Sequence, residues 1–400
     1  MQWWETYTTW EALVARCRAL LLDMTFPTVR AWKQQSPGRR VVGCFPVYTP
    51  QEILAAAGAL PVSLFGGRGQ MEIDHADSRI QSFVCSIARS TLELGLAGHL
   101  DWMDGFVVPS ICDVARNLSG VWQHNFNGGP QGPGKSHRVF YLHLPQNVDS
   151  PAADTYYRGE LQRLSHWLAE LTGEPVTDGA LRAAIGLANY NRELLSELYT
   201  RRAARPEQWP ASHVYAVASV GSVLPRAKHN ALLARALALG EKNPPPRRDF
   251  VRVALCGAFC EQPPLELLDA LEEAGCAVVD DDLGIGARFF PAPVACDGDP
   301  LTTLAGAYLH KTVLTPVNNP GRRSRSADLL RRCKDKAIQG VVFASPKFCE
   351  PALYDAVLLK RAVEAAGLPT LEFEYEEKMS VFESVRMQAE TFVESILFFS

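Results

Sequence analysis

The stretch GFVVPSICDVARNL at 105–118 has a near copy at 340–353, which reads GVVFASPKFCEPAL. Each begins with glycine, continues as a short apolar run, and then reads Pro-x-x-Cys followed by an acidic residue. The apolar run predicts a buried strand, and the residues after the cysteine predict a helix. The repetition therefore indicates two copies of one strand–helix unit, more than half the chain length apart.

The segments upstream of this repeat match as well. Residues 40–65, RVVGCFPVYTPQEILAAAGALPVSLF, predict strand, loop, helix and strand, and residues 251–282 predict the same order. The stretches 138–145 and 368–375 add one further strand to each copy. Strands that alternate with helices are typical of parallel sheets. We therefore expect an α/β fold with two related, doubly wound parallel-sheet domains.

The remaining sequence is helical in pattern. We predict an N-terminal helical segment at 1–38, a first α/β domain at 39–150, a helical segment at 151–245 and a second α/β domain at 246–400. The helical segment contains patterns such as YYRGELQRLSHWLAELTG and ends at KNPPPRRD, a proline-rich stretch typical of a linker.

Composition narrows the classes of function. The chain has 400 residues, of which 47% are hydrophobic and 21% charged, and a formal net charge of −4. This charge gives no electrostatic signature of nucleic-acid binding. No apolar run approaches the ~18 residues of a membrane span. The first residues lack a basic stretch with a cleavage site. Ten cysteines without an export signal indicate reduced thiols or metal ligands, and we expect a cytoplasmic protein.

The repeated cysteines are the main candidates for chemistry. Cys112 and Cys349 lie just beyond strand ends, where open α/β sheets bind ligands. Both also begin a predicted helix, whose N-terminus favours negative charge, so we expect thiolates with a lowered pKa. The repeat thus directs two thiolates toward corresponding sheet edges, where they bind metal or react. The alternative is two buried cysteines that were duplicated with the rest of the unit.

Two other cysteines are relevant only in combination with these. Cys85, in IQSFVCSIARSTLELGLAG, shares a helical face with apolar residues, so packing alone explains it unless it is a third ligand. Cys260, in GAFCEQPP, follows a strand, precedes an acidic residue and opens a helix. Three or four thiolates from separate segments favour an iron–sulfur cluster over a hard cation.

The stretch GPQGPGKS at 129–136 fits the pattern of a phosphate-binding loop. Such a loop needs a strand before it, a helix after it, and free N–H groups to hold phosphate. Pro130 and Pro133 remove two donors, and the residues that follow predict a strand. We therefore expect an ordinary loop and no nucleotide site in this chain.

Three acidic residues are candidates for substrate orientation or proton transfer. Asp281 lies at a strand end in VVDDD, Glu52 lies in the first turn of a helix, and Glu261 follows Cys260. Solvation at a strand end or a favourable interaction with the helix dipole would explain these residues equally well.

Several long stretches resemble the 2-hydroxyacyl-CoA dehydratase and benzoyl-CoA reductase family. They are VVGCFPVYTPQEILAAAGALPV, SFVCSIARSTLELGL, VPSICDVARNLSGVW, GAFCEQPPLELL and FASPKFCEPALYD. The similarity runs from about residue 10 to the C-terminus. Within the family, SICDVARNLSG, FCEQPPL and VVDDD are most similar to the C-type, cluster-binding subunits of ATP-dependent benzoyl-CoA reductases.

The resemblance implies a 4Fe–4S cluster between the two α/β domains. The cysteines that hold it in the family correspond to Cys85, Cys112 and Cys349. The fourth iron position is open in some members, or another group such as Cys260 fills it. Glu52, Glu261 and Asp281 are then candidates for delivering protons to a site that excludes water.

The resemblance also implies an activity and partners. Such a subunit pairs with a paralogous catalytic subunit, and ATP-hydrolysing subunits, with ferredoxin as upstream donor, drive electrons into the pair. The reductase converts benzoyl-CoA to a cyclohexadiene-carboxyl-CoA with low-potential electrons. One alternative is a subunit of a (R)-2-hydroxyacyl-CoA dehydratase, which recycles its electron. Another is a non-catalytic electron-relay or scaffold subunit whose partner holds the acyl-CoA.

Overall fold

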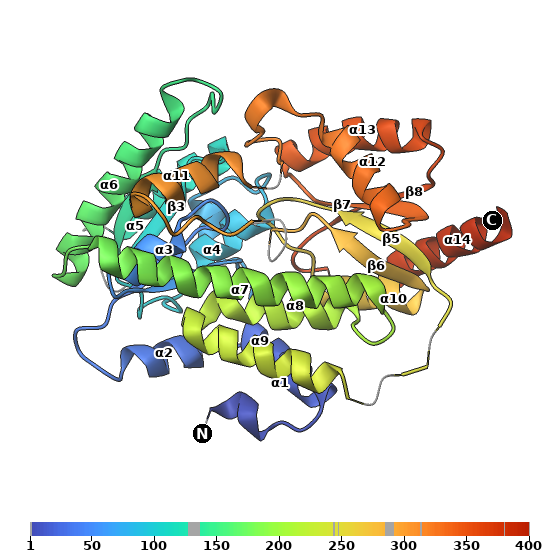
Figure 1. Cartoon of the computed structure of the whole chain (residues 1–400), viewed down its shortest axis with the longest axis horizontal. Helices are drawn as coiled ribbons and strands as arrows, with labels where there is room; N and C mark the ends of the chain where they lie inside the picture. The colour runs from blue at the N-terminus through green and yellow to red at the C-terminus, as the bar shows by residue number, and fades with distance from the viewer. Residues whose placement is uncertain are drawn as a thin grey trace.

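A computed structural model describes the chain except for residue 1, 127–136, 243–244, 247, 285–291, 313, 380 and 400. Two parallel sheets of four strands each lie side by side (Figure 1). The first has the order β2-β1-β3-β4 and the second has the order β6-β5-β7-β8, so the predicted repetition and the parallel α/β class are confirmed. The phosphate-loop-like stretch at 129–136 lies outside the described residues.

Corresponding strands occupy corresponding places in the two sheets. The strands of the first sheet are β1 (Val41–Cys44), β2 (Leu60–Ser63), β3 (Gly105–Pro109) and β4 (Arg138–Leu142). Those of the second are β5 (Val251–Cys256), β6 (Cys276–Asp281), β7 (Gly340–Pro346) and β8 (Thr370–Tyr375). The central strands β3 and β7 are buried along their whole length, as their continuous apolar sequence predicts.

Glycine begins both copies of the repeated stretch because a helix packs against the start of each strand. A Cβ atom on Gly105 would lie 2.6 Å from the Trp167 ring, and one on Gly340 would lie 2.5 Å from the Phe392 ring. The aromatic rings therefore occupy the space that any side chain at these positions would need.

Helices cover the sheets and link the two halves. The first half contains α3 (Gln51–Ala56), α4 (Ser86–Leu96) and α5 (Asp113–Phe126). The second contains α10 (Leu265–Glu273), α11 (Pro300–His310), α12 (Arg325–Asp335), α13 (Glu350–Ala365) and α14 (Glu383–Phe399). Helix α10 has 9 residues and α3 has 6, a difference of about one turn.

Between the halves, the chain is helical. This region contains α6 (Ala153–Thr172), α7 (Asp178–Ala204), α8 (Ala211–Ser219), the short η3 (Val220–Val223) and α9 (Arg226–Gly240). The N-terminal part consists of η1 (Trp3–Thr6), α1 (Trp10–Leu22) and α2 (Pro27–Lys33). The long helix α7 runs across both halves in Figure 1 and contacts α3 in one and β6 in the other.

Contacts of α1 and α11 tie parts of the chain that are distant in sequence to one another. Arg18 of α1 forms a bidentate ion pair with Asp269 of α10, at 2.6 and 2.7 Å. Helix α11 packs beside α6, and its Leu304 and Tyr308 share an apolar core with Val42 of β1. The halves are therefore interlocked. In the described part of the chain, no helix is both long and apolar enough to cross a membrane.

Candidate functional site

Four cysteines lie where strands end or helices begin. Cys85 and Cys349 are the N-cap residues of α4 and α13, and Cys112 immediately precedes α5. The sequence suggested that Cys85 lies within a helix, but the structure places it at the start of one. Cys260 lies in the loop between β5 and α10, so the expectation that it opens a helix is wrong, because α10 begins only after Pro264.

These four thiols are brought together from both halves of the chain. Burial raises the pKa of Cys85, and the nearby charges of Glu261, Cys349 and Cys112 raise it further. Cys260 forms a side-chain hydrogen bond with Cys349, which is the main reason that the pKa of Cys260 is raised. The nearby charges of Cys85 and Cys112 raise the pKa of Cys260 further. The site therefore lies between the first sheet, which positions Cys112, and the second, which positions Cys349.

The expectation of a thiol with a lowered pKa is wrong for Cys112. Burial raises the pKa of the Cys112 thiol to about 11, although the N–H groups of Ala115 and Val114 oppose this rise. The Ala115 N–H donates to Cys112 Sγ at 3.4 Å. The helix terminus thus stabilises a thiolate, but desolvation costs more in this buried position. A positively charged group bound among the thiols would reverse that balance, since a coordinated thiol loses its proton.

The donor set fits an iron–sulfur cluster in its chemistry, because thiolates are the usual ligands of such clusters. Three of the four thiols are buried and Cys112 is half-buried. Among the described residues, no group of three or more His, Cys, Asp or Glu side chains has the arrangement of ligands around a metal ion.

Glu261 belongs to the surroundings of these thiols. Its Oε2 accepts a hydrogen bond from the backbone N–H of Ile87 at 3.2 Å, in the first turn of the helix that Cys85 begins. Burial and the neighbouring Glu377 raise its pKa well above the usual range. Its Oε1 is buried and has no hydrogen-bond partner in the described part of the chain. Glu261 thus connects the Cys260 loop with the Cys85 helix.

Asp281 lies elsewhere. Arg202 of α7 donates to Asp281 Oδ2 at 2.6 Å, and the side chains of the pair are only 2% and 1% exposed. Its neighbours Asp280 and Asp282 are also buried, where Asp280 pairs with Arg332 and Asp282 accepts from the Gly257 N–H. These strand-end acids are therefore not solvated, and each has a specific partner.

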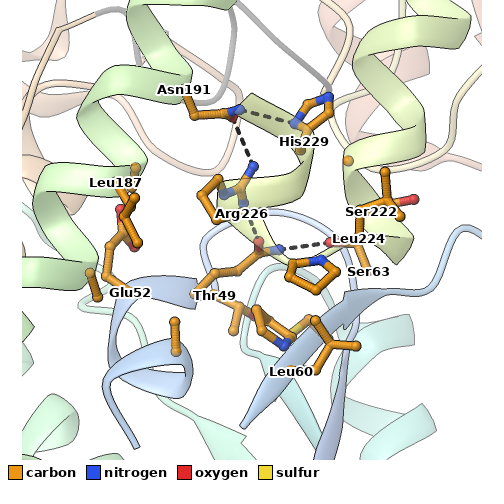
Figure 2. Close-up of a pocket in the computed structure, with 18 of the residues that line it drawn as sticks. Thr49, Glu52, Leu60, Ser63, Leu187, Asn191, Ser222, Leu224, Arg226 and His229 are labelled. Carbon is orange, nitrogen blue, oxygen red and sulfur yellow. Dashed lines mark hydrogen bonds between the residues drawn. The ribbon is translucent and has the colours of Figure 1, made fainter. Parts of the chain in front are cut away.

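Glu52 lines a separate cavity of about 400 Å³ between α3, α7 and α9 (Figure 2). Arg192 forms an ion pair with Glu52, and the Tyr308 hydroxyl donates to its second oxygen at 3.0 Å. None of the four cysteines lines this cavity. Gly284 also lines it, and Gly284 packs against Phe259 and Gln262, the residues on either side of Cys260 and Glu261.

Sequence reasoning missed the polar residues opposite Glu52. Arg226 projects between Asn191 and Ser63 in Figure 2 and donates to Asn191 Oδ1 at 2.8 Å. A second hydrogen bond joins it to Gln51 Oε1 at 2.7 Å. Arg226 and Asn191 come from helices far from α3 in sequence, and no motif marks them. Only the tertiary packing of α7 and α9 on α3 brings them together.

The chain is similar in sequence to several known proteins. The chain is 40% identical to the C-type subunit of benzoyl-CoA reductase from Thauera aromatica, over 97% of this chain and 99% of that protein. It is 28% identical to the beta subunit of lactoyl-CoA dehydratase from Anaerotignum propionicum, over 90% and 92% of the two chains. It is 24% identical to the (R)-phenyllactyl-CoA dehydratase beta subunit of Clostridium sporogenes, over 90% and 93%. Residues 46–396 match the model of the 2-hydroxyglutaryl-CoA dehydratase D-component family. The chain therefore belongs to the 2-hydroxyglutaryl-CoA dehydratase D-component family.

Proposed function

We propose that this chain is the cluster-binding catalytic subunit of an ATP-dependent benzoyl-CoA reductase. The 40% identity to a benzoyl-CoA reductase subunit over almost the whole chain supports this activity. The observation that supports the proposal is that the buried Cys85 thiol lies near enough to Cys112 and Cys349, from different halves, for their charges to raise its pKa. These three residues would hold a 4Fe–4S cluster, which supplies low-potential electrons for reduction of the aromatic ring of benzoyl-CoA.

The chain itself provides burial, ligands and hydrogen bonds. Three of the four thiols are buried and Cys112 is half-buried, so the site excludes water. The Ala115 N–H donates to Cys112 Sγ, and hydrogen bonds to sulfur raise the reduction potential of such sites. Glu261 holds the first turn of the Cys85 helix and thereby positions that ligand.

Cys260 has two roles open to it. Its side-chain bond to Cys349 makes it a hydrogen-bond partner of a ligand in the free protein. Its thiol is also a candidate for the fourth iron position. In either role a Cys260 variant would change the environment of the cluster more than its iron content, because three ligands remain.

The proposal includes partners of the kinds that the resemblance implies. The relatives described above are all named as subunits. We expect a paralogous catalytic subunit, ATP-hydrolysing subunits that deliver electrons, and ferredoxin as their donor. Glu52 and Asp281 are less suited to proton delivery than Glu261, since both form ion pairs away from the cysteines.

A dehydratase subunit is the second candidate. The family match and the 28% identity to a lactoyl-CoA dehydratase subunit favour it. The ratio of ATP hydrolysed to product formed separates the two reactions. A reductase consumes ATP with every turnover, whereas a dehydratase that recycles its electron consumes far less than one ATP per product.

Iron analysis of anaerobically purified protein tests the cluster assignment. Wild-type protein should contain about four irons per chain, the content of one 4Fe–4S cluster. Cys112→Ser and Cys349→Ser should each lose most of this iron. Cys296→Ser, at an exposed cysteine, is the matched control and should keep it. Full iron in both ligand variants would refute the assignment. Assays on benzoyl-CoA and a 2-hydroxyacyl-CoA, with the partner subunits present, then decide the reaction.

A further inference from the structure

The cavity beside Glu52 has the features of a small-molecule site. Its volume of about 400 Å³ falls in the range of ligand pockets, and most of its wall is apolar, including Trp32, Phe45 and Leu60. Ala55, Leu187 and Ala227 line it and are themselves exposed, so the cavity opens to the surface between α3, α7 and α9. A ligand with an apolar body can therefore enter the cavity from the solvent and bury its apolar surface there.

The charges in the wall do not cancel. The charged residues that line the cavity in the described part of the chain are Glu52, Arg192 and Arg226. Glu52 is paired with Arg192 and accepts a further bond from Tyr308. Arg226 donates to the neutral amides of Asn191 and Gln51. The cavity therefore has an excess of one positive charge, located at Arg226.

The groups around Arg226 are fixed before any ligand binds. Asn191 Nδ2 donates to His229 Nδ1 at 3.0 Å and to Asn230 Oδ1 at 2.7 Å, so its oxygen must face Arg226. Gln51 Nε2 donates to Ser63 Oγ at 2.8 Å, which turns the Gln51 oxygen toward Arg226. These two oxygens take two of the five N–H donors of the guanidinium. The other donors remain for a ligand, and holding the guanidinium in place reduces the entropy lost on binding.

We propose that this cavity binds a small aromatic or cycloaliphatic monocarboxylate, with its carboxylate on Arg226 and its ring against the apolar wall. A guanidinium and a carboxylate form charge-assisted, often bidentate, hydrogen bonds. The single excess positive charge matches a single negative charge. This site goes beyond the proposed function: none of the four cysteines lines it, and binding there requires no iron.

A free acid and a CoA thioester share an apolar acyl body and oxygen acceptors, but only the free acid has a negative charge next to the ring. Comparing the binding of benzoate, benzamide and benzoyl-CoA therefore shows whether the cavity takes the free acid or the thioester. Calorimetric titration of the full chain should show saturable binding of benzoate. Benzamide, which has the same shape without the charge, should bind at least tenfold more weakly.

Variants locate the binding. Arg226→Gln should weaken benzoate binding at least tenfold, and Arg226→Lys should weaken it less because the charge remains. Lys228→Gln removes the same charge from the same helix outside the cavity and should bind like wild type. Ala188→Phe fills the cavity from α7 and should abolish binding with Arg226 intact. Because Ala188→Phe tests the cavity without altering Arg226, the proposal does not depend on one variant folding correctly.

Three results would overturn the proposal: no saturable benzoate binding by wild type, equal binding of benzamide, or unchanged binding in folded Arg226→Gln and Ala188→Phe. Arg226-dependent binding of benzoyl-CoA at least tenfold tighter than that of benzoate would assign the cavity to the thioester and overturn the free-acid claim. Iron content measured in the same samples keeps this test separate from the proposed function. A protein without iron that binds benzoate would refute the cluster and support this site.

Discussion

The two halves have sheets of the same strand order, but the loop after β1 and the corresponding loop after β5 differ in length and in what they position. In the first half, residues 45–49 connect β1 to Pro50, and α3 then places Glu52 in the wall of the cavity. In the second half, the longer loop 257–263 connects β5 to Pro264 and places Cys260 and Glu261 next to the other cysteines. The second loop is thus two residues longer than the first and contains Cys260 and Glu261, whereas the first half places Glu52 of α3 in the cavity wall.

A second difference concerns charge at the edge strands. Strand β2 ends at Ser63, whereas β6 ends in buried aspartates that are paired with cations from α7 and α12. Removing these paired charges from the second half should therefore lower the stability of the fold without changing the activity.

The largest expected effect comes from breaking the Arg202–Asp281 pair. Arg202→Leu leaves a buried carboxylate without its partner and should lower the free energy of unfolding by about 3 to 5 kcal/mol. Urea denaturation measures this loss. Arg331→Leu removes an arginine from an exposed ion pair and should change stability by less than about 1 kcal/mol.

The double variant Arg202→Leu/Asp281→Leu should regain much of the lost stability, since no charge is then left alone. It should also retain iron, because Asp281 lies away from the cysteines. Loss of iron in a stable double variant would instead give Asp281 a role in the cysteine site.

The next effect concerns pH on the cavity side. Burial lowers the pKa of His229 to about 3, so the folded protein holds this ring neutral while the unfolded chain protonates it near pH 6.5. Stability due to His229 is therefore complete above about pH 6.5 and is lost as pH falls toward 3. Between pH 6.5 and 5 the loss should be about 1.6 kcal/mol.

His229→Gln removes this titration and serves as the control. The difference in unfolding free energy between wild type and variant, measured by urea denaturation, should shrink by that amount as pH falls to 5. A difference that does not depend on pH would show that the ring titrates in the folded protein as it does in the unfolded chain.

The smallest effect comes from the two glutamates at matched helix positions. Glu52 and Glu266 are each the second residue of their helix, but Glu52 is buried and Glu266 is exposed. Glu52→Gln should cost about 1.5 kcal/mol, because the bond to Arg192 loses its charge. Glu266→Gln should change stability by less than about 0.5 kcal/mol. Equal effects in thermal or urea unfolding would show that the halves use this position alike.

The sequence predicts the sheets well because their signals are local. Apolar runs with flanking glycine and proline mark the strands and helix starts, and the repeat indicates that both halves have the same strand order. The cysteines of interest are also identifiable, although Cys85 required a family resemblance. The pKa of Cys112 was wrongly predicted because burial depends on segments distant in sequence, and desolvation outweighs the local helix effect. The partners of Asp281 and Arg226 come from helices of the central region, so no local pattern reveals them.

The ion pair of α1 with α10 and the packing of α11 beside α6 have a consequence for how the molecule holds together over time. A half cut out at the boundary between the repeats would expose the apolar core that Leu304 and Tyr308 share with Val42, or lose the contact of Arg18 with Asp269. Neither half has a complete core alone, so local opening of one weakens the other and the chain unfolds cooperatively. The cysteine thiols between the halves are therefore held in place by the same cooperative packing. A fluctuation that separates Cys112 from Cys349 must also pull apart helices far from either residue.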